Sequence, residues 1–172
     1  MTAGRSNKQN KLSWNTPSKY ADLIHRFFNY KLDLDPCSNV DSIIDAKTKF
    51  TLPLDGLLQN WSNNTIYINP PYGRDYERKT SIKNWIRKAY EAHIKYSSEI
   101  LMLIPVATNT SHWKEYIFKK AYICFLHDTR LVFRINKNEN NKGSPMACAM
   151  IYYGKHKNKF VRTFGDFGFV VE

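Results

Sequence analysis

Residues 65–106 read TIYINPPYGRDYERKTSIKNWIRKAYEAHIKYSSEILMLIPV, and this stretch decides the fold. Residues 65–69 are rich in β-branched and aromatic side chains and stop at two prolines, which is typical of a strand. Residues 81–95 carry apolar side chains at helical spacing, and residues 99–106 form a nearly continuous apolar run, which indicates a strand covered on both faces. A strand, a helix and a strand in this order predict an α/β domain with a mainly parallel sheet.

The residues before this stretch predict one helix and one short strand. Thr16 is a suitable N-cap, and Pro17 suits the first helical position because its missing N–H would be unpaired there. Apolar residues follow at helical spacing as far as Phe27, so one face of the helix should pack inward. Residues 32–35 resemble a short strand that ends at Pro36.

The residues after it predict a helix at 112–120 and strands at 121–126, 131–135 and 146–153. The last two strands are joined by a polar loop, residues 136–144, with no helix between them. We therefore expect an antiparallel hairpin at one edge of the sheet. In open α/β sheets the ligand binds beyond the carboxyl ends of the strands, so residues at strand ends are the first candidates for a site.

Composition narrows the class of protein. The 172 residues suit one domain, and 42% hydrophobic with 24% charged residues argues against disorder. The net charge of +11 indicates a polyanionic partner: nucleic acid first, then an anionic membrane surface, with an inert basic surface as the plain alternative. We interpret residues 1–13 as a flexible basic tail, either solvated or touching phosphate, and residues 14–172 as the domain.

Membrane-spanning, secreted and metal-binding classes are not expected. The apolar runs are too short to cross a bilayer, and the N-terminus lacks the apolar segment of a secretory signal. The three cysteines, Cys37, Cys124 and Cys148, form no close pair and leave an odd count, which predicts neither a disulfide framework nor a zinc site. These features favour a reducing, cytoplasmic setting.

The strongest local signal is Asn69-Pro70-Pro71-Tyr72, at the end of the strand predicted for residues 65–69. The prolines stiffen the backbone and remove two N–H donors, so the Asn69 side-chain oxygen and the Pro70 carbonyl form a pair of acceptors that suits an NH₂ group. Tyr72 adds an aromatic face for a planar ring. The alternative is a structural Pro-Pro turn capped by Asn69.

These four residues match the NPPY motif, and residues 14–154 resemble the small, phage-type, Dam-like DNA N6-adenine methyltransferases that depend on S-adenosylmethionine. The preceding blocks match in order: Trp14-Asn15-Thr16-Pro17, Asp35-Pro36-Cys37 and Asp55-Gly56-Leu57 with Trp61. Three blocks that follow also match: Leu103-Ile104-Pro105, Arg130-Leu131-Val132-Phe133 and Gly143-Ser144-Pro145. One departure is the loop Cys37-Ser38-Asn39-Val40, which has no glycine where the family at large has a glycine-rich loop.

The resemblance implies a single-domain, Rossmann-like class I methyltransferase fold and methyl transfer from S-adenosylmethionine to the N6 amino group of adenine in double-stranded DNA. It assigns the transfer to Asn69, Pro70, Pro71 and Tyr72. It assigns cofactor binding to Trp14, Thr16, Pro17, Asp35, Pro36, Cys37 and Asp55, the last of these to the adenine of the cofactor. The plainer alternatives are a turn-forming Asp35, a solvated Asp55 and a Trp14 that belongs to the core.

Six further residues are candidates for contact with DNA: Arg74, Lys79, Arg130, Phe133, Lys137 and Lys142. The cations would bind phosphates, which makes binding depend steeply on salt. Phe133 would supply a second stacking face for a base extruded from the duplex. Each of these residues also has an ordinary interpretation, as a solvated charge or as a core aromatic.

Other functions fit the same motif because it recognises an amino group rather than adenine itself. The enzyme alternative is an RNA or protein-glutamine N-methyltransferase, although the positive charge disfavours a protein target. The non-enzyme alternative is a DNA-binding module that has lost activity, and binding of S-adenosylmethionine would separate the two. The phage-like resemblance suggests a phage or other mobile element, and the sequence predicts neither a recognition sequence nor an oligomeric state.

Overall fold

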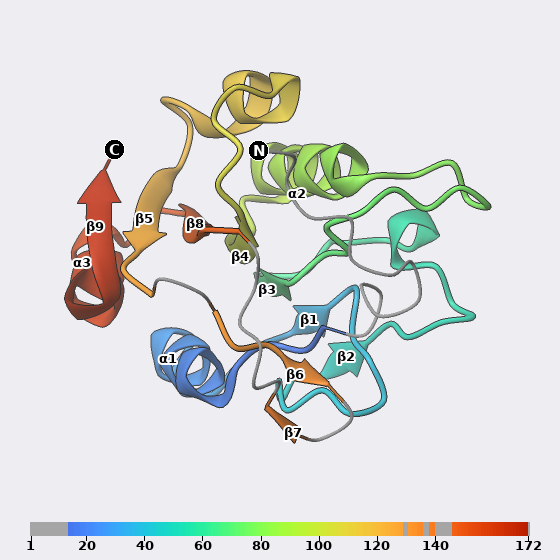
Figure 1. Cartoon of the computed structure of the whole chain (residues 1–172), viewed down its shortest axis with the longest axis horizontal. Coiled ribbons are helices and arrows are strands. Elements are labelled where there is room, and N and C mark those ends of the chain that lie inside the picture. Colours follow the sequence, from blue (N-terminus) through green and yellow to red (C-terminus); the bar gives the residue numbers. More distant parts are fainter. Residues whose placement is uncertain (1–13, 129–130, 136–137, 140–145, 172) are drawn as a thin grey trace.

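The computed structural model describes residues 14–128, 131–135, 138–139 and 146–171, which form a sheet with helices on both faces (Figure 1). The predicted basic tail at residues 1–13 lies outside the described residues. Seven strands occur in the order β2-β1-β3-β4-β8-β5-β9. Their bounds are Leu34–Asp35 (β1), Thr48–Lys49 (β2), Thr65–Ile68 (β3), Glu99–Pro105 (β4), Tyr122–Leu126 (β5), Cys148–Tyr153 (β8) and Gly168–Val171 (β9). Strands β1 to β5 run in one direction and β8 and β9 in the other, which confirms the predicted α/β class with a mainly parallel sheet.

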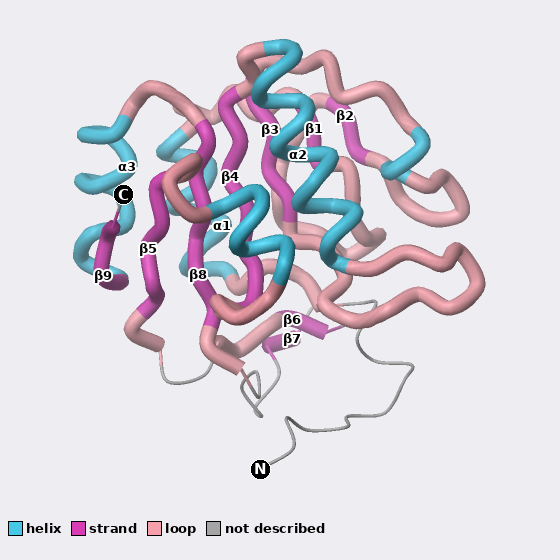
Figure 2. The backbone as a smooth tube through the Cα atoms, turned by 90° about the horizontal axis from the view of Figure 1, so that it is seen from above, coloured by secondary structure: helices cyan, strands magenta, loops and turns pink. Residues whose placement is uncertain are grey.

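Helices pack on both faces of this sheet (Figure 2). One face carries α1 (Ser18–Phe27) and α3 (Lys157–Phe164), and the other carries α2 (Ile82–Tyr96) and a π-helical turn, η3 (Trp113–Ile117). Two 3-10 turns, η2 (Gly56–Leu58) and η4 (Gly165–Phe167), complete the helical elements of the described chain. In that part of the chain no helix combines the length and apolar character that crossing a bilayer requires.

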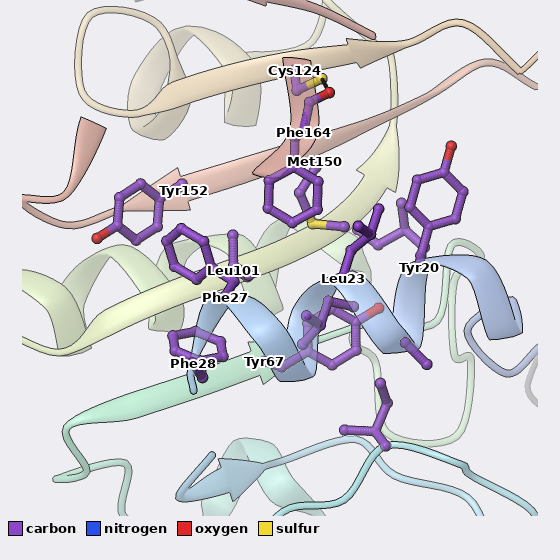
Figure 3. Packing of buried hydrophobic residues seen from close by; sticks show 14 of the residues in the cluster. Tyr20, Leu23, Phe27, Phe28, Tyr67, Leu101, Cys124, Met150, Tyr152 and Phe164 are labelled. Carbon is purple, nitrogen blue, oxygen red and sulfur yellow. Dashed lines mark hydrogen bonds between the residues drawn. The ribbon is translucent and has the colours of Figure 1, made fainter. Parts of the chain in front are cut away.

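Strand β4 is buried on both faces, as its apolar run predicts. Leu101 and Leu103 point into the cluster under α1, whereas Ile100, Met102 and Ile104 point into the cluster under α2. Figure 3 shows α1 lying across the strands, with its side chains directed at those of the sheet. Each fully buried aliphatic side chain contributes about 1.5–3 kcal/mol, so the two clusters make the sheet a rigid support for its loops.

The predicted edge hairpin is wrong. Strand β8 lies inside the sheet, antiparallel to both β4 and β5, and all of its side chains are buried, which an edge position would not allow. Residues 131–135 instead contribute β6 (Arg134–Ile135), which pairs with β7 (Asn138–Glu139) in a separate two-stranded sheet. Strand β7 falls within the loop predicted at 136–144.

Three local predictions also need correction. The N-cap of α1 is Pro17 and not Thr16. The Thr16 hydroxyl is instead hydrogen-bonded to the Tyr67 hydroxyl in the core, over 2.7 Å. Only two residues of the strand predicted at 32–35 pair as β1, and the helix predicted at 112–120 is largely the short π-helical turn η3. Helix α3 and strand β9, which we did not predict, complete the far edge of the sheet.

The order of the strands creates a crevice between β1 and β3. The chain passes from β1 to β2 on one side and then returns to place β3 on the other side of β1. At such a switch point the connections after the two central strands diverge and leave room for a ligand at their carboxyl ends. Asp35 ends β1 and Asn69 follows β3, so the fold brings the two predicted motifs to this crevice.

Candidate active site

Three adjoining cavities lie at the carboxyl ends of β1 and β3. The motif cavity is lined by Trp14, Cys37, Asn39, Asn69, Pro70, Pro71 and Tyr72. The apolar cavity is lined by Pro36, Cys37, Ser38, Asn39, Phe50, Leu52, Leu54, Gly56, Pro71, Arg78 and Trp85. The polar cavity is lined by Trp14, Asn15, Thr16, Asp35, Cys37, Ser38, Asn39, Ser42, Tyr67 and Asn69. Cys37 and Asn39 line all three, so the cavities adjoin one another, and together we call them the cleft.

The orientation of the Asn69 amide is set by a hydrogen bond. Its Nδ2 donates to the backbone carbonyl of Trp14 over 2.9 Å. That carbonyl is itself held in place, because the next residue, Asn15, pairs its backbone with Arg134 in both directions, at 2.9 and 3.1 Å. With the amino end of the amide bound to a protein carbonyl, Oδ1 is the end that can accept a hydrogen bond from a ligand. Asn69 lines both the motif cavity and the polar cavity.

Aromatic side chains form one wall of the motif cavity. The Tyr72 hydroxyl donates to the Leu103 carbonyl over 3.2 Å, and its ring meets Trp14 and Phe133 edge-on, with centroids 6.3 and 5.7 Å away. Trp14 stacks on Phe133 at 5.1 Å. Phe133 is only 2% exposed, so it supports Trp14 from behind. The structure presents Trp14, and not Phe133, to the cavity.

Asp35 supplies a buried carboxyl group to the polar cavity. Burial raises its pKa to about 6, against the opposing effects of the Cys37 N–H, the Ser38 hydroxyl and the charge of Lys49. The Cys37 N–H donates to Asp35 Oδ1 over 3.2 Å. Asp35 is therefore ionised at neutral pH and suits a cationic or hydroxyl-bearing ligand. Burial also raises the pKa of the neighbouring Cys37 thiol well above its ordinary value, so the thiol stays neutral.

Asp55 lines none of the three cavities, although its neighbours Leu54 and Gly56 line the apolar cavity, and its carboxylate already has partners. Its Oδ1 accepts the Leu57 N–H over 2.9 Å and caps η2, and its Oδ2 lies 3.9 Å from the Arg78 guanidinium. The following Gly56 packs against the loop after β1: a Cβ atom there would lie 1.8 Å from the Pro36 carbonyl oxygen. Only glycine allows this approach.

Only some of the remaining predicted residues line one of the three cavities. Thr16 lines the polar cavity and Pro36 the apolar one, whereas Pro17 caps α1 and lines none of the three cavities. Arg74 and Lys79 are exposed on the loop after Tyr72. Arg130, Lys137 and Lys142 lie outside the described residues. Across the described ranges, no group of three or more His, Cys, Asp or Glu side chains is placed to hold a metal ion.

Several residues that line the cavities were not predicted from the sequence. Asn39 donates through Nδ2 to Asn15 Oδ1 over 3.2 Å and so joins the loop after β1 to the segment before α1. Its position directly after Asp-Pro-Cys-Ser was the signal that could have marked it. Arg78 and Trp85 had no such signal, because Trp85 fits the apolar stripe of α2 and Arg78 lies in a charged loop.

A mainly parallel α/β sheet with a cleft at its switch point is compatible with a methyltransferase fold. The model of the Dam family, described as DNA N-6-adenine-methyltransferase (Dam), matches residues 4–164, and the chain belongs to this family. Neither the curated proteins nor the solved structures contain a match to the chain.

Proposed function

We propose that the chain transfers a methyl group from S-adenosylmethionine to the N6 amino group of adenine in DNA. Membership of the Dam family supports adenine in DNA as the substrate. The observation that carries the proposal is the fixed Asn69 amide, whose Nδ2 is bound by the Trp14 carbonyl over 2.9 Å. This bond leaves Oδ1, beside Pro70, as an acceptor for an incoming amino group.

The two acceptors at Asn69 and Pro70 would overcome the low nucleophilicity of the adenine amino group. The exocyclic nitrogen of adenine is a poor nucleophile because its lone pair is delocalised into the ring. Two acceptors, Asn69 Oδ1 and the Pro70 carbonyl, would bind both N6 hydrogens and favour a pyramidal nitrogen with an available lone pair. They would also stabilise the positive charge that develops on nitrogen during attack, so they act on the transition state more than on the bound substrate.

The cleft fits the proposed cofactor in both chemistry and layout. The apolar cavity, with Phe50, Leu54 and Trp85, suits an adenine ring, and the polar cavity, with Asp35, suits the ammonium group of the methionine end. The motif cavity shares lining residues with both. When bound, the cofactor supplies a methyl group on a sulfonium. We include the Rossmann-like class I methyltransferase fold in this proposal, because such open α/β sheets bind their ligand at the switch point, where this cleft lies.

The target adenine must leave the duplex to reach Asn69. Extrusion costs a few kcal/mol in unstacking and unpairing. Stacking on an aromatic side chain returns about 1–3 kcal/mol per base, and Trp14 and Tyr72 are the aromatic residues that line the motif cavity. Arg74 and Lys79, exposed on the adjoining loop, would bind the phosphates.

A methylation assay tests the proposal. Purified protein is incubated with S-adenosylmethionine and unmethylated DNA, the DNA is digested to nucleosides, and N6-methyl-2′-deoxyadenosine is measured by mass spectrometry. Asn69→Ala should abolish the product. Asn64→Ala, just before the opposite end of β3, should keep it, and both variants should melt cooperatively. Full activity of Asn69→Ala would overturn the mechanism.

Parallel substrates separate the alternatives. Product on RNA or on a glutamine-containing protein, with none on DNA, would replace the proposed substrate while keeping the site. DNA binding with neither methylation nor measurable binding of S-adenosylmethionine would identify a DNA-binding module.

A further inference from the structure

Arg78 contacts the carboxylates of two residues in separate segments of the chain, Asp55 and Asp75. Its Nε donates to Asp75 Oδ2 over 2.7 Å, and its Nη1 lies 3.9 Å from Oδ2 of Asp55, the N-cap of η2. The same side chain lines the apolar cavity. One guanidinium therefore connects the wall of that cavity to the loop that follows Tyr72.

That loop contains a well-defined turn. Asp75 and Thr80 pair their backbones in both directions, at 2.9 and 3.1 Å. The Asp75 carboxylate accepts the N–H groups of Glu77 and Arg78, each over 3.0 Å. These contacts with Arg78 lower the pKa of Asp75, so its carboxylate stays ionised and paired. A planar guanidinium bound to a carboxylate fixes direction as well as distance.

The turn presents the groups that DNA binding would use. Arg74 and Lys79 are exposed on it, and the Arg74 guanidinium lies 5.7 Å from the centroid of the Tyr76 ring, which is 72% exposed. Figure 1 shows the loop between β3 and α2 projecting from the body of the molecule. The position of these side chains relative to the motif cavity depends on how the turn is attached to the rest of the molecule. Arg78 provides such an attachment through its contact with Asp55.

We propose that Arg78 is a positioning residue that couples cofactor binding to DNA binding. The inference rests on the proposed function of the cleft. A ligand in the apolar cavity packs against Arg78 and so favours the arrangement in which the guanidinium bridges Asp55 and Asp75. That arrangement also places the turn for DNA. Because both ligands favour the same arrangement, each must tighten the binding of the other by the same factor.

The test measures this factor directly. Calorimetry gives the Kd of S-adenosylhomocysteine with and without a DNA duplex, and anisotropy gives the Kd of the duplex with and without S-adenosylhomocysteine. The wild-type protein should show the same factor in both measurements, of about fivefold or more. Arg78→Gln should bring it to about one. Arg87→Gln, which removes an exposed arginine paired with Glu91 on α2, should leave the factor unchanged.

A second variant separates coupling from folding. In Asp75→Asn the side-chain oxygen still accepts the two N–H groups of the turn, but the charged partner of Arg78 is gone. We expect this variant to keep the wild-type Kd for S-adenosylhomocysteine alone, to lose the coupling and to show a raised KM for DNA with little change in kcat. Arg78→Lys, which keeps the charge without the fork, should restore only part of the factor.

The outcomes distinguish the inference from the function beneath it. If the wild-type protein methylates DNA and binds both ligands, but Arg78→Gln or Asp75→Asn keeps the full coupling factor, the role of Arg78 is refuted and the function stands. The same holds if the wild-type factor is one. If the wild-type protein makes no N6-methyladenine and binds neither ligand, the proposed function fails and the inference falls with it.

Discussion

The Asn69 side chain donates to the Trp14 carbonyl, joining residues 55 positions apart in the sequence. This bond connects the segment before α1 to the carboxyl end of β3, and it sets which end of the amide faces the cleft. A carboxylate in this position would place an oxygen against a carbonyl oxygen. Residue 69 must therefore be asparagine for two reasons: the hydrogen bond to the Trp14 carbonyl needs the amide N–H, and the proposed substrate needs the amide oxygen.

We predict that Asn69→Asp loses both stability and activity. Replacing the donor by an acceptor breaks the bond to Trp14 and leaves two oxygens facing each other, which should cost about 1–3 kcal/mol. Urea denaturation measures the first effect and the mass-spectrometric assay the second. Asn64→Asp, at an exposed site next to the same strand, serves as the control. An Asn69→Asp protein with wild-type stability would mean that the hydrogen bond to Trp14 does not orient the Asn69 amide.

Gly56 and Gly165 should respond in opposite ways to alanine. At Gly56 the new methyl group would lie 1.8 Å from the Pro36 carbonyl, so the backbone must move, and we expect a loss of about 1–3 kcal/mol together with weaker binding of S-adenosylmethionine. At Gly165 the nearest atom would be 3.9 Å away and φ is −61°, so alanine should be neutral or stabilise by up to about 1 kcal/mol. Thermal melts compare the pair, and a tolerated Gly56→Ala would contradict the close packing of η2 on the loop after β1.

The elements that could be predicted from sequence are those with a local signal. Strand β3, helix α2 and strand β4 each carry their own periodicity, and their residue ranges were predicted closely. The placement of Asp35 and Asn69 at strand ends also followed from the pattern, whereas the pairing of β1 with β3, which makes the two ends neighbours, did not.

The features that could not be predicted depend on contacts between distant residues. An apolar run such as β8 can pair with any strand, and its place between β4 and β5 is set by packing on both faces. The backbone pairing of Asn15 with Arg134 has no local signature, although it positions Trp14. Arg78 reaches the apolar cavity from the loop after Tyr72, and its contacts with Asp55 and Asp75 have no local signature either.

Asp35 should make stability depend on pH. Burial raises its pKa from 3.8 to about 6, so the folded protein binds this proton more tightly than the unfolded chain. The free energy of unfolding should therefore fall as pH rises from about 4 to 6, by about 3 kcal/mol from this residue. Asp35→Asn should remove this part of the dependence. Identical pH profiles for the two proteins in urea would show that the carboxyl group is not buried in solution.

The affinity for S-adenosylmethionine should change with pH in the opposite direction. The ammonium group of the ligand needs an ionised Asp35, which the free protein holds only above about pH 6. Binding should weaken below that pH by up to about tenfold per unit, and calorimetry between pH 5 and 7 measures it. Asp35→Asn should bind weakly and without this slope. A wild-type Kd that is constant across the range would place the ammonium group away from the polar cavity.

DNA binding should weaken steeply as salt rises. Each phosphate contact adds about 0.9 to the slope of log K against log salt, so Arg74→Gln and Lys79→Gln should each reduce the slope by about that amount. Lys31→Gln provides the control, because Lys31 is exposed at the opposite end of the sheet, where its carbonyl accepts a bond from Thr65 at the start of β3. Anisotropy titrations at several salt concentrations give the slopes. A slope near zero for the wild-type protein would contradict a nucleic-acid substrate. A steep slope that neither variant reduces would mean that the phosphate contacts lie outside the loop after Tyr72.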